Sequence, residues 1–87
     1  MDVKSIKDNI VTNVYQIPKE KRVPLHKHVD KDEVFYCIGG SGFGVLQDDE
    51  VSLKVGQAFI VPAGTMHALR TDDNLCVTSF LIPVITE

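Results

Sequence analysis

Short β-rich runs follow one another along most of the chain, and this succession restricts the fold more than any other feature of the sequence. Valine, isoleucine, phenylalanine and tyrosine, which favour strands, recur in these runs. Glycine, proline, asparagine and aspartate, which favour turns, separate them at short intervals. No segment shows a convincing helical period. The sequence therefore predicts eight strands, at Ile10–Ile17, Val23–Val29, Glu33–Ile38, Gly42–Gln47, Val51–Lys54, Ala58–Val61, Met66–Arg70 and Leu75–Ile82.

Eight short strands in one open sheet would leave long unpaired edges. Closure removes such edges, so the sequence predicts an all-β barrel or sandwich. With 87 residues the chain has room for one small domain, which we place at residues 1–87. The glycine-rich segment Gly39–Gly44 matches no phosphate-binding fingerprint, and we interpret it as a tight hairpin connection between two strands.

Charge and hydropathy argue against several classes of partner. Nine Lys and Arg against twelve Asp and Glu give a net charge of −3, which offers no positive field for nucleic acid. The longest apolar-rich stretch, Cys76–Ile85, is interrupted by Thr78, Ser79 and Pro83 and is too short to span a bilayer. The first ten residues lack the apolar stretch of a signal peptide. We therefore expect a soluble, cytoplasmic protein that binds neither nucleic acid nor a membrane.

The chain contains two cysteines, Cys37 and Cys76. Two cysteines are too few for the several disulfides that stabilise small secreted proteins, and their number is typical of a protein in a reducing compartment. We interpret both as buried, apolar thiols. The sequence leaves open whether they lie close enough to pair.

Residues that commonly bind metals gather at two places in the chain. His26 and His28 alternate in a predicted strand and therefore share a face, and Glu33 opens the next strand. His67 follows the Pro62-Ala63-Gly64 turn. Three imidazoles and one carboxylate suit Fe(II), Mn(II), Ni(II), Cu(II) or Zn(II). On these residues alone, two unrelated histidines remain the commoner explanation of a His-x-His pair.

Two spaced motifs around these residues resemble the motifs of the cupin superfamily. The first cupin motif is built on HxH, three or four residues, E, six residues and G, which is matched by His26, His28, Glu33 and Gly40. The second reads G-x5-P-x-G-x2-H-x3-N, which is matched by Gly56, Pro62, Gly64 and His67. Two positions depart from the family pattern: Glu20 stands where the first motif usually opens on glycine, and Thr71 replaces the final asparagine. Neither position is a metal ligand in the family.

The resemblance implies a small single-domain cupin, a double-stranded β-helix or jelly-roll barrel of about eight short strands. It also implies one divalent transition metal inside the barrel, with Fe, Mn, Ni, Cu and Zn as the candidates. The family's ligands correspond to His26, His28, Glu33 and His67.

Strand parity extends the prediction to the lining of the site. If Glu33 faces inward, so do Phe35 and Cys37, and if His67 faces inward, so does Leu69. The predicted pocket lining is therefore Phe35, Cys37 and Leu69, which offers no obvious general acid or base. The same parity directs four residues away from the barrel, namely Val34, Tyr36, Ala68 and Arg70.

A four-ligand site leaves two positions on an octahedral metal for water, oxygen or a chelating substrate. We therefore expect a metal-dependent enzyme that acts on a small oxygen-rich molecule, and the cupin resemblance implies a reaction of the dioxygenase, decarboxylase, isomerase or lyase type. The alternative is a non-catalytic module that binds or senses a small ligand. The catalytic residues, the substrate and the metal are not indicated by the sequence.

A homodimer is also expected, because so short a chain buries only ~60% of its surface and has edge strands in need of partners. Such a dimer would pair sheet edges or pack apolar outer faces. The candidate contact segments are Ile10–Ile17 and Leu75–Ile85.

Overall fold

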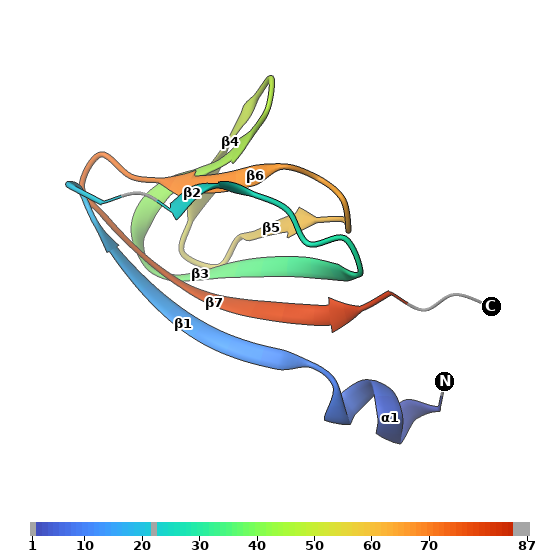
Figure 1. The fold of residues 1–87 in the computed structure, drawn as a ribbon. Helices are drawn as coiled ribbons and strands as arrows, with labels where there is room; N and C mark the ends of the chain where they lie inside the picture. The colour runs from blue at the N-terminus through green and yellow to red at the C-terminus, as the bar shows by residue number, and fades with distance from the viewer. Residues whose placement is uncertain (1, 22, 85–87) are drawn as a thin grey trace.

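A computed structural model describes residues 2–21 and 23–84. Ile85, the last residue of the C-terminal segment expected in a dimer contact, lies outside the described residues. The chain is mostly β-strand, as the sequence predicted. The elements are α1 (Val3–Asp8), β1 (Val11–Pro18), β2 (Val23–His26), β3 (Lys31–Leu46), β4 (Glu50–Lys54), β5 (Ala58–Val61), β6 (His67–Arg70) and β7 (Asn74–Pro83) (Figure 1).

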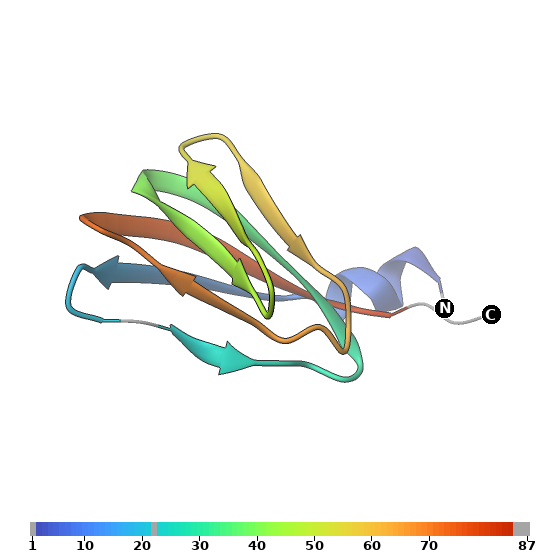
Figure 2. The same ribbon diagram turned by 90° about the horizontal axis from the view of Figure 1, so that it is seen from above.

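The strands form two antiparallel layers that share β3. One layer, here called sheet A, has the order β1-β7-β3-β5, and the other, sheet B, contains β2-β6-β3-β4. Figure 1 shows β1 and β7 side by side in one layer and β2 with β6 in the other. In Figure 2, the view from above, β4 and β6 lie across the long strands β1 and β7. The apolar core lies between these layers, together with the buried side chains of Glu33 and His67.

A single long strand replaces the third and fourth predicted strands, so the expected hairpin at Gly39–Gly44 is wrong. β3 pairs with β7 through Gly40 and with β4 from Ser41 onward, which carries it from sheet A into sheet B. The change of sheet follows a register shift between Cys37 and Gly39. Gly40 has φ +68°, and a Cβ there would lie 2.2 Å from the Asn74 carbonyl oxygen. The glycines therefore bend a continuing strand and do not reverse it.

A short N-terminal helix, α1, is the element that the sequence did not predict. Asp2 caps it, because its Oδ1 accepts the Ser5 backbone N–H at 2.8 Å, and this bond lowers the pKa of the Asp2 carboxyl. Six residues are too few to show a helical period, and the helix has no buried residue. No helix in residues 2–21 and 23–84 is long and apolar enough to cross a membrane.

The two cysteines lie on opposite faces of sheet A. Cys37 is fully buried in the core, next to Val77 in the ladder, and its thiol donates toward the carbonyl oxygen of Gly39. Cys76, the neighbour of Val77, is half-buried and points to the other face. Both are free thiols, and strand alternation keeps them from pairing.

The two layers lie close together where Gly44 of sheet B meets Phe59 of sheet A. A Cβ on Gly44 would lie 2.5 Å from the Phe59 ring, which is buried and packs 6.0 Å from the ring of Phe35. We expect Gly44→Ala to cost about 1–3 kcal/mol of unfolding free energy, because the ring has no room to move within the core. Chemical denaturation by urea measures this change.

Gly39→Ala is the matched control for this substitution. Its Cβ would lie 3.4 Å from the Cys76 Cβ, an ordinary contact, and we expect a cost below about 1 kcal/mol. Equal denaturation midpoints for the two variants would contradict the close approach of Gly44 and Phe59.

Candidate metal centre

The structure brings the four predicted ligands together from three strands and a loop. His26 ends β2 and is paired with His67, the first residue of β6, while His28 lies in the loop that follows β2. Glu33 stands near the start of β3. One ligand atom from each residue lies within 4.8 Å of those of the other three. The two distant motifs thus form one cluster, which could hold a metal ion.

The carboxylate of Glu33 is the centre of this cluster. Its Oε1 lies 2.9 Å from Nε2 of His67, 3.4 Å from Nε2 of His28 and 3.9 Å from Nε2 of His26. Two donor atoms that each bind one ion at ~2.1 Å stand about 3 Å apart at right angles and about 4.2 Å apart when opposed. The three separations fall within or close to this range.

Two neighbouring groups orient the deepest ligands. Ser79 of β7 is fully buried, and its hydroxyl donates to Oε2 of Glu33 at 2.5 Å, which leaves Oε1 to face the imidazoles. Nδ1 of His67 lies 2.9 Å from the carbonyl oxygen of Thr65. Because a carbonyl oxygen can only accept, Nδ1 carries a proton, which leaves Nε2 as the ring nitrogen that can offer a lone pair to a metal ion.

This arrangement fits a bound cation. With Nδ1 protonated, a neutral His67 directs the lone pair of Nε2 at a carboxylate oxygen only 2.9 Å away. Two acceptors at that distance require a positive charge between or on them, either a proton or a metal ion. Three imidazole nitrogens and one carboxylate oxygen suit a divalent transition metal.

The cluster is closed on one side and open on the other. The side chains of Glu33 and His67 are 4% and 1% exposed, whereas those of His26 and His28 are 36% and 33% exposed. The ring of Phe35 lies 5.7 Å from that of His67 and forms an apolar wall on the inner side. The cluster is therefore exposed to solvent on the side of His26 and His28.

The residues predicted to line the pocket are all buried, as strand parity required. Phe35 borders His67 directly, while Cys37 and Leu69 belong to the apolar core, and their pocket-lining role stays a prediction. Ala68 lies opposite Val45 on the outer face of sheet B and is nevertheless only 8% exposed.

Tyr36 and Arg70, the side chains that look most capable of proton transfer, lie away from the cluster. Tyr36 is 43% exposed on the outer face of sheet A. Arg70 lies over the Phe43 ring on the outer face of sheet B and donates to Glu50 and Asp72. The hydrogen bond to Glu50 raises the pKa of Arg70, and these ion pairs hold the guanidinium outside the barrel.

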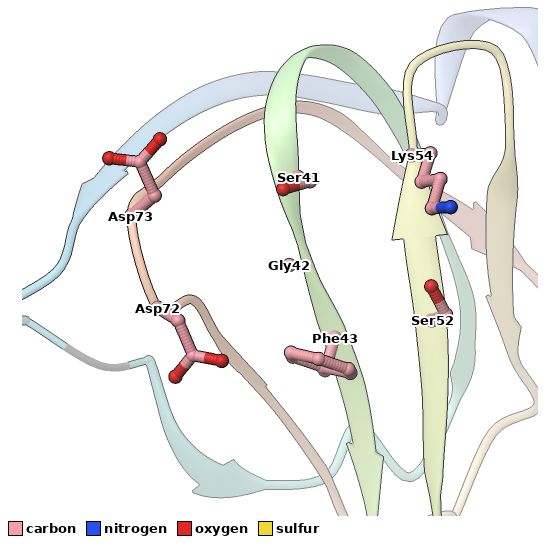
Figure 3. Close-up of a pocket in the computed structure, with 7 residues that line it drawn as sticks. All are labelled: Ser41, Gly42, Phe43, Ser52, Lys54, Asp72 and Asp73. Atoms are coloured by element: carbon pink, nitrogen blue, oxygen red, sulfur yellow. The ribbon is translucent and has the colours of Figure 1, made fainter.

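A small groove of about 170 Å³ lies on that outer side, separate from the histidines (Figure 3). It is lined by Ser41, Gly42, Phe43, Ser52, Lys54, Asp72 and Asp73. Figure 3 shows Asp72 and Asp73 on the connection that faces β3 and β4. None of the four candidate ligands lines this groove.

Sequence reasoning missed Ser79 and Thr65. For Ser79 a signal existed, because it continues the inward alternation of Leu75 and Val77 in β7, where a polar side chain needs a buried partner. For Thr65 no signal existed, because the backbone oxygen, not the side chain, makes the contact.

Removal of the Ser79 hydroxyl tests the orientation of Glu33. We expect Ser79→Ala to weaken metal binding about 10–100-fold, because Oε2 loses its buried donor and the carboxylate is free to turn. Competition against a chelator measures the affinity. Thr71→Val removes another buried hydroxyl, which donates to the Ser41 carbonyl oxygen far from the cluster. An equal loss of affinity in both variants would contradict a specific role for Ser79.

Together, the two antiparallel layers and the inward-facing histidine–glutamate cluster define a β-barrel protein with a candidate metal centre. The family model described as "Cupin domain" matches residues 13–82, and the chain belongs to this family. Several curated proteins are similar to this chain. Acireductone dioxygenase of a Sulfurihydrogenibium species is 40% identical over 65 residues, which cover 67% of this chain and 36% of the relative.

Quercetin 2,3-dioxygenase of Bacillus subtilis is 32% identical over 71 residues, which cover 80% of this chain and 21% of the relative. The matches span 21% to 56% of the length of the curated relatives. Among solved structures, a Thermotoga maritima protein described as a predicted oxalate decarboxylase superposes with a TM-score of 0.82 at 20% identity. That match covers 97% of this chain and 76% of the other, and it shows a shared fold.

Proposed function

We propose that this cupin is a metal-dependent enzyme of the dioxygenase type that acts on a small, oxygen-rich molecule. The observation that carries the proposal is the convergence of three imidazole Nε2 atoms on Oε1 of Glu33. His26, His28, Glu33 and His67 would hold the metal. When bound, a divalent transition metal would supply a Lewis-acidic centre with open positions for dioxygen or for a substrate oxygen.

The residues around the cluster favour a substrate that binds through two neighbouring oxygens. Four protein ligands leave two positions on a six-coordinate ion, which an enediol, a hydroxyketone or a hydroxyacid can occupy as a chelate. Phe35 supplies an apolar surface beside His67, and the half-exposed His26 and His28 leave the entrance open. The cluster and the Phe35 ring beside it thus suit a small molecule with a compact polar end.

Reactions that need a protein acid or base fit the site less well. Tyr36 and Arg70 lie on the outer faces, so neither can exchange a proton with a molecule at the cluster. Ser79 is already committed to Glu33 and holds the carboxylate still. The protein's contribution is therefore to position the ligands, to admit one small molecule and to keep one side of it dry.

The relatives favour oxygenation over the other reactions that the family resemblance allows. Five of the matching curated proteins are named as dioxygenases, one of quercetin and four of acireductone. We place the protein in the cytoplasm as part of the same proposal, because both of its cysteines are free thiols.

Oxygen uptake tests the proposal. The protein is loaded separately with Fe(II), Mn(II), Ni(II) and Cu(II), and an oxygen electrode records uptake with a panel of enediols, hydroxyketones and ortho-hydroxyphenols. We expect turnover with at least one metal and one class of compound. The His67→Ala variant, treated with the same metals, is expected to show no turnover. Arg70→Ala, whose side chain lies outside the barrel, serves as the matched control and keeps the activity.

The alternative is a module that binds a small ligand without turnover. If a compound binds the metal-loaded protein tightly and neither oxygen nor the compound is consumed, the enzyme proposal fails and the binding module stands. Calorimetric titration with the same compounds distinguishes binding without turnover from the case in which none of the compounds binds.

A further inference from the structure

We propose that Asn13 of β1 binds the substrate of the metal centre through its side-chain amide, which hydrogen-bonds an oxygen beyond the two that chelate the ion. The inference rests on the proposed function, because it concerns a molecule bound at the four-ligand cluster. It narrows the substrate class to compounds that carry a third oxygen next to the chelating pair. Its basis is the position of Asn13 in the register of sheet A.

The register places Asn13 on the inner face of sheet A, beside residues that contact the cluster. Asn13 is paired with Ser79 of β7, and Ser79 is paired with Phe35 of β3. Side chains directly opposite each other in antiparallel strands point to the same face, so these three form one row inside the barrel. Ser79 donates to Glu33, and the Phe35 ring lies 5.7 Å from that of His67. Asn13 therefore stands one strand, or ~4.8 Å, from a residue that holds a candidate ligand.

The amide of Asn13 is available to a ligand. The residue is half-buried, and its amide makes no hydrogen bond to another residue in the described part of the chain. Among residues 2–21 and 23–84 no buried polar side-chain atom lacks a partner, so the unpaired amide reaches solvent. An amide offers two N–H donors and one carbonyl acceptor, and it can therefore pair with a hydroxyl, a carbonyl or a carboxylate group.

The surroundings of Asn13 do not explain an amide at this position. Its neighbours on the inner face, along and across the strands, are apolar or aromatic, namely Val11, Tyr15, Val77 and Leu81. Asparagine is disfavoured in strands, and an amide adds nothing to hydrophobic packing. A residue that served packing alone would be apolar or β-branched. Contact with a polar ligand is the better explanation of the amide.

The inner face of sheet A is open to solvent along the first half of β1. Ile17, near the end of this strand, is 4% exposed, whereas the inner-face residues Tyr15 and Val11 are 39% and 45% exposed. Sheet B therefore covers the inner face at Ile17 and leaves it accessible nearer the start of the strand. Asn13 lies within this accessible part.

The open part of β1 lies on the same side of the barrel as the exposed ligands. His26 and His28, which are the exposed ligands, belong to β2 and the loop after it. Figure 1 shows β1 and β2 in opposite layers, and Figure 2 shows both strands on the side of the molecule away from β4 and β5. A molecule bound at the exposed side of the cluster thus has the inner face of β1 within its reach.

Two hydroxamates that differ by one hydroxyl group test this inference without turnover. Acetohydroxamate and glycolohydroxamate chelate a metal through the same two oxygens, and glycolohydroxamate carries a third oxygen on the next carbon. Calorimetry measures their dissociation constants for the Ni(II)-loaded protein. We expect the preference for glycolohydroxamate to be about 3–10-fold larger in the unaltered protein than in Asn13→Ala, as one net hydrogen bond predicts. Asn13→Val, in which a strand-favouring residue replaces the amide, should behave as Asn13→Ala does.

Gln16→Ala is the matched control, because it removes an amide from the exposed outer face of the same strand. We expect it to keep the full preference for glycolohydroxamate. We also expect all three variants to bind Ni(II) as the unaltered protein does, since neither Asn13 nor Gln16 is among the candidate ligands. Competition against a chelator measures the Ni(II) affinity, and circular dichroism checks the fold.

The outcomes separate this inference from the proposed function. An undiminished preference in both Asn13 variants, or an equal loss in Gln16→Ala, would overturn the role of Asn13 and leave the proposed function standing. Loss of Ni(II) binding in the Asn13 variants would also overturn it, because Asn13 would then support the metal site and not the substrate. If neither hydroxamate binds the Ni(II)-loaded protein, the chelating site of the proposed function fails, and the inference fails with it.

Discussion

His67→Ala is expected to lower the affinity for a divalent transition metal by more than about 100-fold. Removal of a residue that hydrogen-bonds a metal ligand typically lowers the metal affinity about 10–100-fold, and removal of the ligand itself lowers it further. His67 is the deepest of the three histidines, and its Nε2 lies nearest to the Glu33 carboxylate. Elemental analysis of untagged protein, purified without chelators or a nickel column, measures the bound metal directly.

A buried histidine also contributes to packing, so a second variant separates binding from folding. His28→Ala removes one ligand from a half-exposed loop position, where the fold depends less on the side chain. We expect it to lose metal as His67→Ala does while it keeps its β-sheet circular dichroism.

Two outer-face residues supply the controls for the ligand variants. Tyr36→Phe and Arg70→Ala should bind metal as the unaltered protein does, because neither side chain faces the cluster. Metal loss in either control to the level of His28→Ala would show that the site is not the histidine–glutamate cluster described above.

Metal binding is expected to raise the melting temperature by about 10–20 °C at a free metal concentration one hundred times the dissociation constant. A ligand at that concentration stabilises the native state by ~2.7 kcal/mol. In a domain of this size each kcal/mol corresponds to roughly 4–8 °C. The four ligands converge only in the folded chain, so the native state binds the ion far more strongly than the unfolded state.

Thermal unfolding followed by circular dichroism, with and without metal, measures this shift. His28→Ala is again the control and should show little change, since it lacks one ligand. An increase of the same size in this variant would indicate metal binding at other surface carboxylates. A chelator should return the unaltered protein to its metal-free melting temperature.

The inner and outer faces of the two sheets account for the main features of this protein. The inner faces carry the apolar core and, at one end, the ligand cluster with Phe35 beside it. The outer face of sheet B carries paired charges, among them Arg70 with Glu50.

The all-β class and the family could be predicted from the sequence because both depend on local signals. Alternating apolar residues and frequent turn residues indicate strands without knowledge of their partners. The parity of Glu33, Phe35 and Cys37 also holds in the structure, because side chains alternate within any one strand. The spacing of the two cupin motifs identified four candidate ligands, His26, His28, Glu33 and His67, although the two motifs are far apart in the sequence.

What the sequence by itself determined was the class of fold, the family and the four side chains that could hold a metal. Only the tertiary structure showed that Gly39–Gly44 bends one continuous strand, because the reason lies in contacts with Asn74 and Phe59 from other strands. Only the tertiary structure placed the Ser79 hydroxyl on Glu33 and the Thr65 carbonyl oxygen on His67. A local pattern can indicate that a buried Ser79 needs a partner, but such contacts join atoms that are distant in the sequence or belong to the backbone, so the pattern does not identify the partner.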